Sequence, residues 1–183
     1  SGVKSKQRMV IGIGGVRRSG KSSLARGLGR HYRARGKKVE IVHQDAYVFP
    51  EADIPRIRDR VDWESPASID FGRFRQAVEE RARIQDVVIA EGLLAFYDEE
   101  LERRYDHRFF LEIGHDTFRE RKRRDDRWGE EPGWYIEHIW ESYLRYGQPH
   151  DPARVVLIDG EKEPDWPRIL ATLEKQENAS AGR

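Results

Sequence analysis

Residues 15 to 22 read Gly15-Val16-Arg17-Arg18-Ser19-Gly20-Lys21-Ser22, and Ser23 follows them. They match the pattern G-x-x-x-x-G-K-[ST], in which glycines let backbone N–H groups close around phosphate oxygens while the lysine adds positive charge. The apolar run at 9–13 precedes the motif as a strand should, and Leu24, Leu28 and Tyr32 follow it at helical spacing. This context predicts binding of a nucleoside triphosphate, with Lys21 on the β- and γ-phosphates and the Ser22 hydroxyl on Mg²⁺.

Length and composition indicate one compact domain over residues 1–183, of which 37% are hydrophobic. The 34 Lys and Arg residues nearly balance the 33 Asp and Glu residues, so no overall field favours nucleic acid or a membrane as partner. The absence of cysteine excludes disulfides and thiolate metal sites. No apolar stretch reaches membrane-spanning length, and we expect a cytoplasmic protein. Residues 1–8 and 177–183 are predicted to be flexible, and nothing indicates the oligomeric state.

Four further apolar runs alternate with helical patterns, at residues 39–42, 87–90, 109–113 and 155–158. With the first strand they predict an α/β fold of the phosphate-loop NTPase type, a five-stranded and mostly parallel sheet flanked by helices. Asp70 is predicted to cap a helix that carries Phe71, Phe74 and Val78 inward, and Thr117 with Glu120 fits a capping box. In such sheets ligands gather at the carboxyl edge.

Acidic residues follow three of the predicted strands: Asp45, Glu91 and Asp159. A carboxylate at that edge can reach Mg²⁺, its waters or an incoming hydroxyl. Glu91 is the candidate to support Mg²⁺, with a turn carboxylate bonded to nearby N–H groups as the alternative. Asp45 is a candidate for the metal or the hydroxyl, with capping of the turn before Pro50 as the alternative. Asp159-Gly160 is typical of a turn.

The segment 118–128 carries six basic residues with acids between them and almost no apolar face. Such a helix is expected to project into solvent or over a ligand. Arg121, Arg124 and Arg127 recur at every third position, as a clamp over phosphates would require; a solvated charged helix and a nucleic-acid patch are the alternatives. Because glycines flank the connection at 129–133, we predict a short helical lid over about 117–133. Within 134–146 the residues Ile136, Ile139, Trp140 and Tyr143 recur at helical spacing and are predicted to be mostly core. The histidines are assigned no metal, and His43, His138 and His150 are expected to be polar core or surface groups.

The chain resembles the nicotinamide riboside kinases, and more broadly the uridine kinase group of phosphate-loop nucleoside kinases. The resemblance runs through most of the chain and is carried by the segments 12–16, 43–45, 61–66, 91–94, 132–135 and 138–144. The last two segments favour the nicotinamide riboside branch. Asp62 with Pro66 and Asp70 looks equally like the substrate loop of uridine kinases.

The resemblance also implies site residues. Residues 15–23 would bind ATP together with the lid residues Arg123 and Arg127, and Lys162 would approach the adenine. Asp45 would be the general base at the 5′-hydroxyl, and Glu91 would hold the Mg²⁺ shell. The acceptor would be bound by residues outside the phosphate loop: Asp45, Tyr47, Asp62 on the ribose hydroxyls, Arg124 and Trp128.

The sequence departs from the nicotinamide riboside kinases at two places. Val61 stands where those kinases usually present an aromatic side chain to the base, and the lid connection is shorter. Tyr47, Trp63 and Trp128 are candidates for stacking on the base, although each could equally be a packing residue.

The expected activity is ATP- and Mg²⁺-dependent phosphorylation of a ribonucleoside 5′-hydroxyl, with nicotinamide riboside favoured and uridine or cytidine as alternatives. Two other readings stay open: a kinase for another small alcohol, and a module that uses ATP to change shape for a partner. The chain has no Asn-Lys-x-Asp guanine-reading motif, and the polar lid suits a small-molecule kinase better than such a module.

Overall fold

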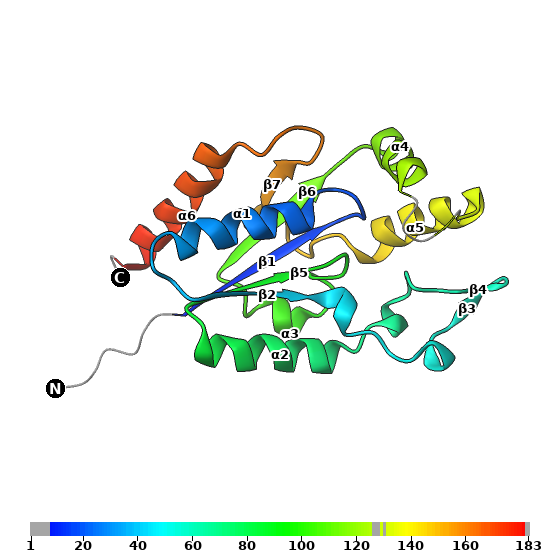
Figure 1. Ribbon diagram of the computed structural model, residues 1–183, viewed down its shortest axis with the longest axis horizontal. Coiled ribbons are helices and arrows are strands. Elements are labelled where there is room, and N and C mark those ends of the chain that lie inside the picture. Colours follow the sequence, from blue (N-terminus) through cyan, green and yellow to red (C-terminus); the bar gives the residue numbers. More distant parts are fainter. Residues whose placement is uncertain (1–7, 126–128, 130, 182–183) are drawn as a thin grey trace.

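The centre of the computed structural model, which describes residues 8–125, 129 and 131–181, is a sheet of five strands (Figure 1). Their order is β2 (Val39–His43), β5 (Val87–Glu91), β1 (Met9–Gly15), β6 (His107–Glu112) and β7 (Val156–Asp159). All four neighbouring pairs are parallel. The predicted α/β sheet is confirmed, with strand limits shifted by one or two residues.

Helices cover both faces of the sheet (Figure 1). α1 (Lys21–Arg33) and α6 (Trp166–Ala181) lie on one face, and α2 (Phe71–Ile84) and α3 (Glu99–Glu102) lie on the other. Side chains alternate along β1, so that Ile11 and Ile13 pack in the core under α1 while Val10 packs in the core under α2. The strands are buried on both sides, which explains why they read as continuous apolar runs.

Two further helices stand beyond the carboxyl ends of the strands: α4 (His115–Arg124) and α5 (Gly133–Tyr146) (Figure 1). Short 3-10 turns complete the connections, at Gln44–Ala46, Glu51–Asp53, Pro66–Ser68 and Pro152–Arg154. α5 carries the predicted stripe into the core: Ile139 and Tyr143 are buried, and Ile136 and Trp140 are partly buried and pack against them.

A small hairpin that the sequence did not predict packs against α5. It consists of β3 (Arg56–Ile57) and β4 (Arg60–Val61). The Arg58 guanidinium lies 4.3 Å from the centre of the Trp134 ring, and that of Arg60 lies 4.9 Å from the Tyr135 ring. Strands of two residues are too short to produce a recognisable alternation, and cation–π contacts with a distant helix hold this pair in place.

The helix caps were predicted with mixed success. The Asp70 side chain accepts a hydrogen bond from the Arg73 amide and caps α2, as expected. The capping box at Thr117 and Glu120 is wrong, because α4 begins at His115 and both residues lie inside it. Glu161, from the turn after β7, supplies the contacts instead: it accepts from the Gly114 amide and pairs with the Thr117 hydroxyl.

α4 packs against α5 more closely than its charge pattern suggested. Phe118 is fully buried and stacks on Trp140, with ring centres 5.3 Å apart. Lys122 is also buried, and its ammonium lies 2.5 Å from the Glu131 carboxylate. One aromatic residue and one neutralised lysine therefore give α4 the anchor that the sequence pattern did not show.

The predicted flexible ends fall partly outside the described residues. Residues 1–7 and 182–183 lie outside them, while Arg8 donates to the Ala82 carbonyl. Residues 177–181 continue α6, and the Tyr32 hydroxyl donates to the Glu177 carboxylate at 3.0 Å. Within the part of the chain that the structure describes, no helix is long and apolar enough to cross a bilayer.

The contact between α1 and α6 leads to a stability prediction with a control in the same helix. A Cβ added at Gly27 would lie 2.2 Å from the Trp166 ring. Gly27→Ala must push α6 away, so we expect it to lower the free energy of unfolding by about 1–3 kcal/mol. Urea denaturation followed by circular dichroism measures the change.

Gly29→Ala is the matched control. A Cβ at Gly29 would lie 3.2 Å from Nη1 of Arg33, whose Nη2 donates to the Val39 carbonyl; a shift of this long side chain by a few tenths of an ångström relieves the contact. Alanine favours a helix interior over glycine by up to about 1 kcal/mol, so this variant should be neutral or more stable than the parent protein. Equal destabilisation by both variants would show that α6 does not constrain α1 at Gly27.

Candidate active site

The phosphate loop lies between β1 and α1 at the carboxyl edge of the sheet. Gly20, the residue before α1, has φ of 102°, a left-handed conformation that favours glycine. It has no side chain to cap the helix, so the first amides of α1 are available to an anion. The Lys21 ammonium and the Ser19 amide both donate to the Val16 carbonyl, at 2.9 and 3.1 Å. The loop is thereby closed on itself around its lysine.

Lys21 has a strongly shifted pKa. Desolvation of its ammonium lowers the pKa from 10.5 to about 8; the charge of Arg17 adds to this lowering, and those of Glu91 and Asp45 oppose it. The two acids whose charges act on Lys21 are those predicted at the ends of β5 and β2. An anionic ligand would raise the pKa of Lys21 again.

Glu91 and Asp45 differ in their surroundings. Glu91 ends β5 and is 5% exposed. Its Oε1 is hydrogen-bonded to Nδ1 of His43 at 2.7 Å. Asp45 is exposed in the 3-10 turn after β2. A buried carboxylate held in one orientation suits a fixed structural or metal-shell role, and an exposed one suits contact with an incoming molecule.

The residues present fit a Mg²⁺ ion held together with phosphates. The donors at this edge are oxygens, the Ser22 hydroxyl and the Glu91 and Asp45 carboxylates, which magnesium prefers. Among the described residues, no group of three or more His, Asp or Glu forms a metal cage. This is the usual situation for Mg²⁺ in kinase sites, where one or two protein oxygens are supplemented by phosphates and waters.

Arg121 of α4 links two loops at this edge of the sheet. Its guanidinium donates to the Arg18 carbonyl at 2.7 Å and to the Gly160 carbonyl at 2.9 Å. It therefore joins the phosphate loop to the turn after β7. Asp159 forms that turn by accepting from the Glu161 amide at 2.9 Å, as its turn dipeptide indicated.

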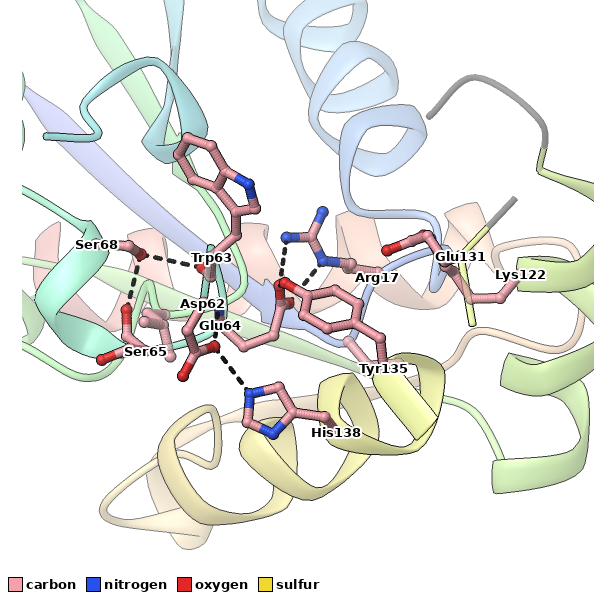
Figure 2. Close-up of polar contacts among 12 residues, drawn as sticks. Arg17, Asp62, Trp63, Glu64, Ser65, Ser68, Lys122, Glu131, Tyr135 and His138 are labelled. Carbon is pink, nitrogen blue, oxygen red and sulfur yellow. Dashed lines mark hydrogen bonds and ion pairs between the residues drawn. The ribbon is translucent and has the colours of Figure 1, made fainter. Parts of the chain in front are cut away.

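Asp62 lies in the segment between β4 and the Pro66–Ser68 turn, and it contacts α5 (Figure 2). Its Oδ1 lies 2.8 Å from Nε2 of His138 and accepts from the Glu64 amide at 3.2 Å. The carboxylate thus has a turn-forming contact and also a partner from a distant helix. His138, expected from the sequence to be an ordinary polar group, orients it.

Glu64 is the most deeply buried acid near the site, at 1% exposure. Arg17 of the phosphate loop donates to it with two nitrogens, Nε to Oε1 at 2.9 Å and Nη2 to Oε2 at 3.2 Å. The Tyr135 hydroxyl of α5 donates to Oε2 at 2.8 Å (Figure 2). Burial and then the charge of Glu64 raise the pKa of Tyr135, which keeps that hydroxyl a donor.

The remaining predicted residues lie in varied settings. Tyr47 packs on Phe74, with ring centres 5.7 Å apart, whereas Trp63 has an exposed ring. Arg123 and Lys162 are exposed, and Arg124 pairs with Glu120 on the surface of α4 at 2.6 Å. Arg127 and Trp128, and with them the centre of the predicted lid, lie outside the described residues.

The sequence did not single out Glu64, Tyr135 or His138 as functional residues. The segments that contain them are among those that carry the family resemblance. A charged residue in the loop pattern, Arg17, was the available signal for a buried acidic partner, but nothing in the spacing identified which acid it would meet.

Comparisons with known proteins agree with the resemblance found in the sequence. No family model matches the chain. The chain is 26% identical to nicotinamide riboside kinase 1 of Homo sapiens over 172 residues, which cover 84% of each protein. It is 28% identical over 166 residues to a uridine kinase of Deinococcus deserti, covering 76% of this chain and 78% of the relative. The resemblance predicted from the sequence motifs is thereby confirmed.

Solved structures agree on the fold. A protein from Bacillus stearothermophilus described as a possible uridine kinase superposes with a TM-score of 0.55 and 20% identity, over 85% of this chain and 91% of that one. At that identity the likeness concerns the fold. The curated relatives are named as kinases, in agreement with the enzyme class predicted from the sequence.

The lowered pKa of Lys21 leads to a prediction for nucleotide binding. Because a bound triphosphate favours the charged lysine, we expect affinity for Mg²⁺–ATP to fall as pH rises through about 8, and binding above that pH to take up protons. In the ligand-free protein the sign is opposite: the folded state holds fewer protons than the unfolded state between about 8 and 10.5, so stability rises there.

Isothermal titration calorimetry in buffers of different ionisation enthalpy measures both the affinity and the proton uptake. Lys21→Met should bind weakly and lose the proton uptake between pH of about 7.5 and 9. A parent protein whose affinity is constant over that interval would contradict the assignment of Lys21 to the phosphates.

Proposed function

We propose that this protein is an ATP- and Mg²⁺-dependent kinase that phosphorylates the 5′-hydroxyl of a ribonucleoside, with nicotinamide riboside as the favoured acceptor. The observation that carries the proposal is the pairing of Arg17, in the phosphate loop, with Glu64, two residues after Asp62, which His138 contacts; the charge of Asp45 also acts on Lys21. A phosphate loop joined to a segment with a carboxylate suited to hydroxyl groups supports transfer between two small molecules. The curated relatives add the acceptor class.

In the proposed reaction the acceptor oxygen bonds to the γ-phosphorus, the bond from that phosphorus to the β,γ-bridging oxygen breaks, and ADP leaves. Asp45 orients the acceptor hydroxyl and takes its proton. Lys21 and the first amides of α1 stabilise negative charge on the phosphates. Most of the rate enhancement comes from holding the two reactants in line, because this transition state needs little covalent help.

Ser22 and Glu91 would hold the Mg²⁺ ion, and Asp45 could contribute a contact. When bound, the ion neutralises charge on the phosphates and fixes their orientation. The contact from His43 keeps the Glu91 carboxylate in one orientation.

Asp62 is the proposed ribose contact. Both contacts described for it use Oδ1, so we assign Oδ2 to the acceptor hydroxyls. Trp63 is the stronger candidate for stacking on the base, because its ring is exposed while Tyr47 packs on α2. Uridine or cytidine is the second candidate acceptor, favoured by the Deinococcus deserti relative.

The direct experiment is a phosphorylation screen with Mg²⁺ and ATP over nicotinamide riboside, uridine, cytidine and small sugars. Formation of a nucleoside 5′-monophosphate from a ribonucleoside supports the proposal. ATP turnover that requires no acceptor would support a nucleotide-driven module instead. Phosphorylation of a sugar but of no ribonucleoside would identify a kinase for another small alcohol.

Asp45→Asn tests the proton acceptor. The amide keeps the shape but cannot take a proton, so kcat should fall by about 10²–10⁴-fold with ATP affinity unchanged, or by less if the transition state is loose. Steady-state kinetics over a magnesium titration measures the effect. Recovery of activity at high magnesium would instead identify Asp45 as a residue of the metal shell.

Asp62 leads to a prediction of ribose selectivity. A partly buried carboxylate that receives two hydroxyls loses a partner when one is missing, so kcat/KM for a 2′-deoxynucleoside should be lower by up to about 10⁴-fold. Asp62→Ala should weaken the ribonucleoside far more than its deoxy analogue. Asp53→Ala, in an exposed turn of the same region, is the control. A ratio unchanged by Asp62→Ala, with stability alone reduced, would leave Asp62 as a turn residue.

A further inference from the structure

Glu64 draws together three segments that are far apart in the sequence. Its two carboxylate oxygens contact Arg17 in the phosphate loop and Tyr135 on α5, and its own backbone follows Asp62 by two residues (Figure 2). The proposed catalytic steps do not use it. A carboxylate that is 1% exposed, placed between the two proposed binding sites, therefore needs another explanation.

Burial of Glu64 is tolerated because its charge is matched. The two parallel N–H donors of Arg17 form the bidentate geometry that binds a carboxylate best, and the Tyr135 hydroxyl satisfies a further acceptor position. Although burial opposes the charge on Arg17, the attraction and hydrogen bonds of Glu64 raise the pKa of Arg17 above its ordinary value. Loss of Arg17 would leave the Glu64 charge buried without its counter-charge, which is costly, so breaking this pair is strongly opposed while Glu64 stays buried.

Each partner of Glu64 belongs to one binding site. Arg17 is the third residue of the loop motif, and its charge acts on Lys21. Tyr135 is one turn before His138, on the same side of α5, and His138 holds Asp62. The segment 62–64 is thus attached to α5 at both ends, through Asp62 and Glu64, and Glu64 also attaches it to the phosphate loop.

We propose that Glu64 is a positioning residue that couples the two sites: while it is paired with Arg17, the loop carrying Asp62 is held in register with the phosphate loop, and nucleotide and acceptor therefore bind with positive cooperativity. A nucleotide that orders the phosphate loop favours the paired state, and the paired state places Asp62 for the acceptor. The coupling is reciprocal, as any coupling of two binding equilibria must be. The acceptor part of this inference rests on the proposed function.

Hydrogen exchange tests the coupling without any acceptor. The probe is Mg²⁺ with a non-hydrolysable ATP analogue, and the readout is amide exchange over residues 60–66. In the parent protein the analogue should slow exchange there by about tenfold, within the usual range of coupling between sites. Glu64→Gln removes the charge that binds Arg17, so the analogue should still protect the phosphate loop but leave residues 60–66 unprotected.

Glu79→Gln is the matched control, because it makes the same substitution in an exposed ion pair. Glu79 lies on α2 and pairs with Arg104. It should keep the full protection of residues 60–66. Should Glu64→Gln fail to fold, the double variant Arg17→Gln with Glu64→Gln leaves no uncompensated buried charge and is expected to lose the same protection. Protection of residues 60–66 that is equal in the parent protein and the Glu64 variant would overturn the proposal.

Kinetics separate positioning from a merely structural role. Glu64→Gln should raise the KM for the acceptor at saturating ATP and the KM for ATP at saturating acceptor by similar factors, about tenfold, while affinity for the ATP analogue without acceptor changes less than about twofold. Lower thermal stability with an unchanged acceptor KM would overturn the positioning role. If the parent protein phosphorylates no ribonucleoside, the proposed function fails, but the hydrogen-exchange result still decides whether Glu64 couples the two loops.

Discussion

The parallel pairing of β1 with β5 and β6 is the constraint on which the site depends. Parallel strands all end at one edge, so whatever follows them is brought together there. The phosphate loop follows β1, Glu91 ends β5, and Asp45 follows β2. Residues that are tens of positions apart in the chain thereby come close enough for the charges of Glu91 and Asp45 to act on Lys21.

Charge at this edge is arranged in matched pairs rather than as a broad positive surface. Arg17 pairs with Glu64 and Lys122 with Glu131, and the charges of Glu91 and Asp45 act on Lys21. This explains why a chain with a formal net charge of +1 can hold a site suited to polyphosphate. The positive groups are local, partly desolvated and oriented, so that they act on a bound anion at short range instead of attracting anions from a distance.

α5 supports the proposed acceptor side of the site. It receives the β3–β4 hairpin on Trp134 and Tyr135, and it holds Asp62 through His138. On its other side it packs against α4 through Trp140 and Phe118. α5 is therefore in contact with the hairpin, the Asp62 segment and α4, and a shift of α5 would change its contacts with all three.

By itself the sequence determined the five strands, the phosphate loop, the capped start of α2 and the acids at the strand ends. Each of these depends on residues that are close in the sequence: an apolar run, a glycine pattern or an Asp before a helix.

Only the tertiary structure decided which side chains pair across the fold. The partnership of Arg17 with Glu64, the contact of His138 with Asp62 and the bracing of two loops by Arg121 join residues whose separation along the chain carries no periodic signal. The capping box predicted at Thr117 is wrong for a related reason: α4 begins at His115, and Glu161 from a distant turn accepts a hydrogen bond from the Gly114 amide just before it. Burial requires that every charge find a partner, but which partner depends on the packing of whole helices, and that is fixed only when the chain has folded.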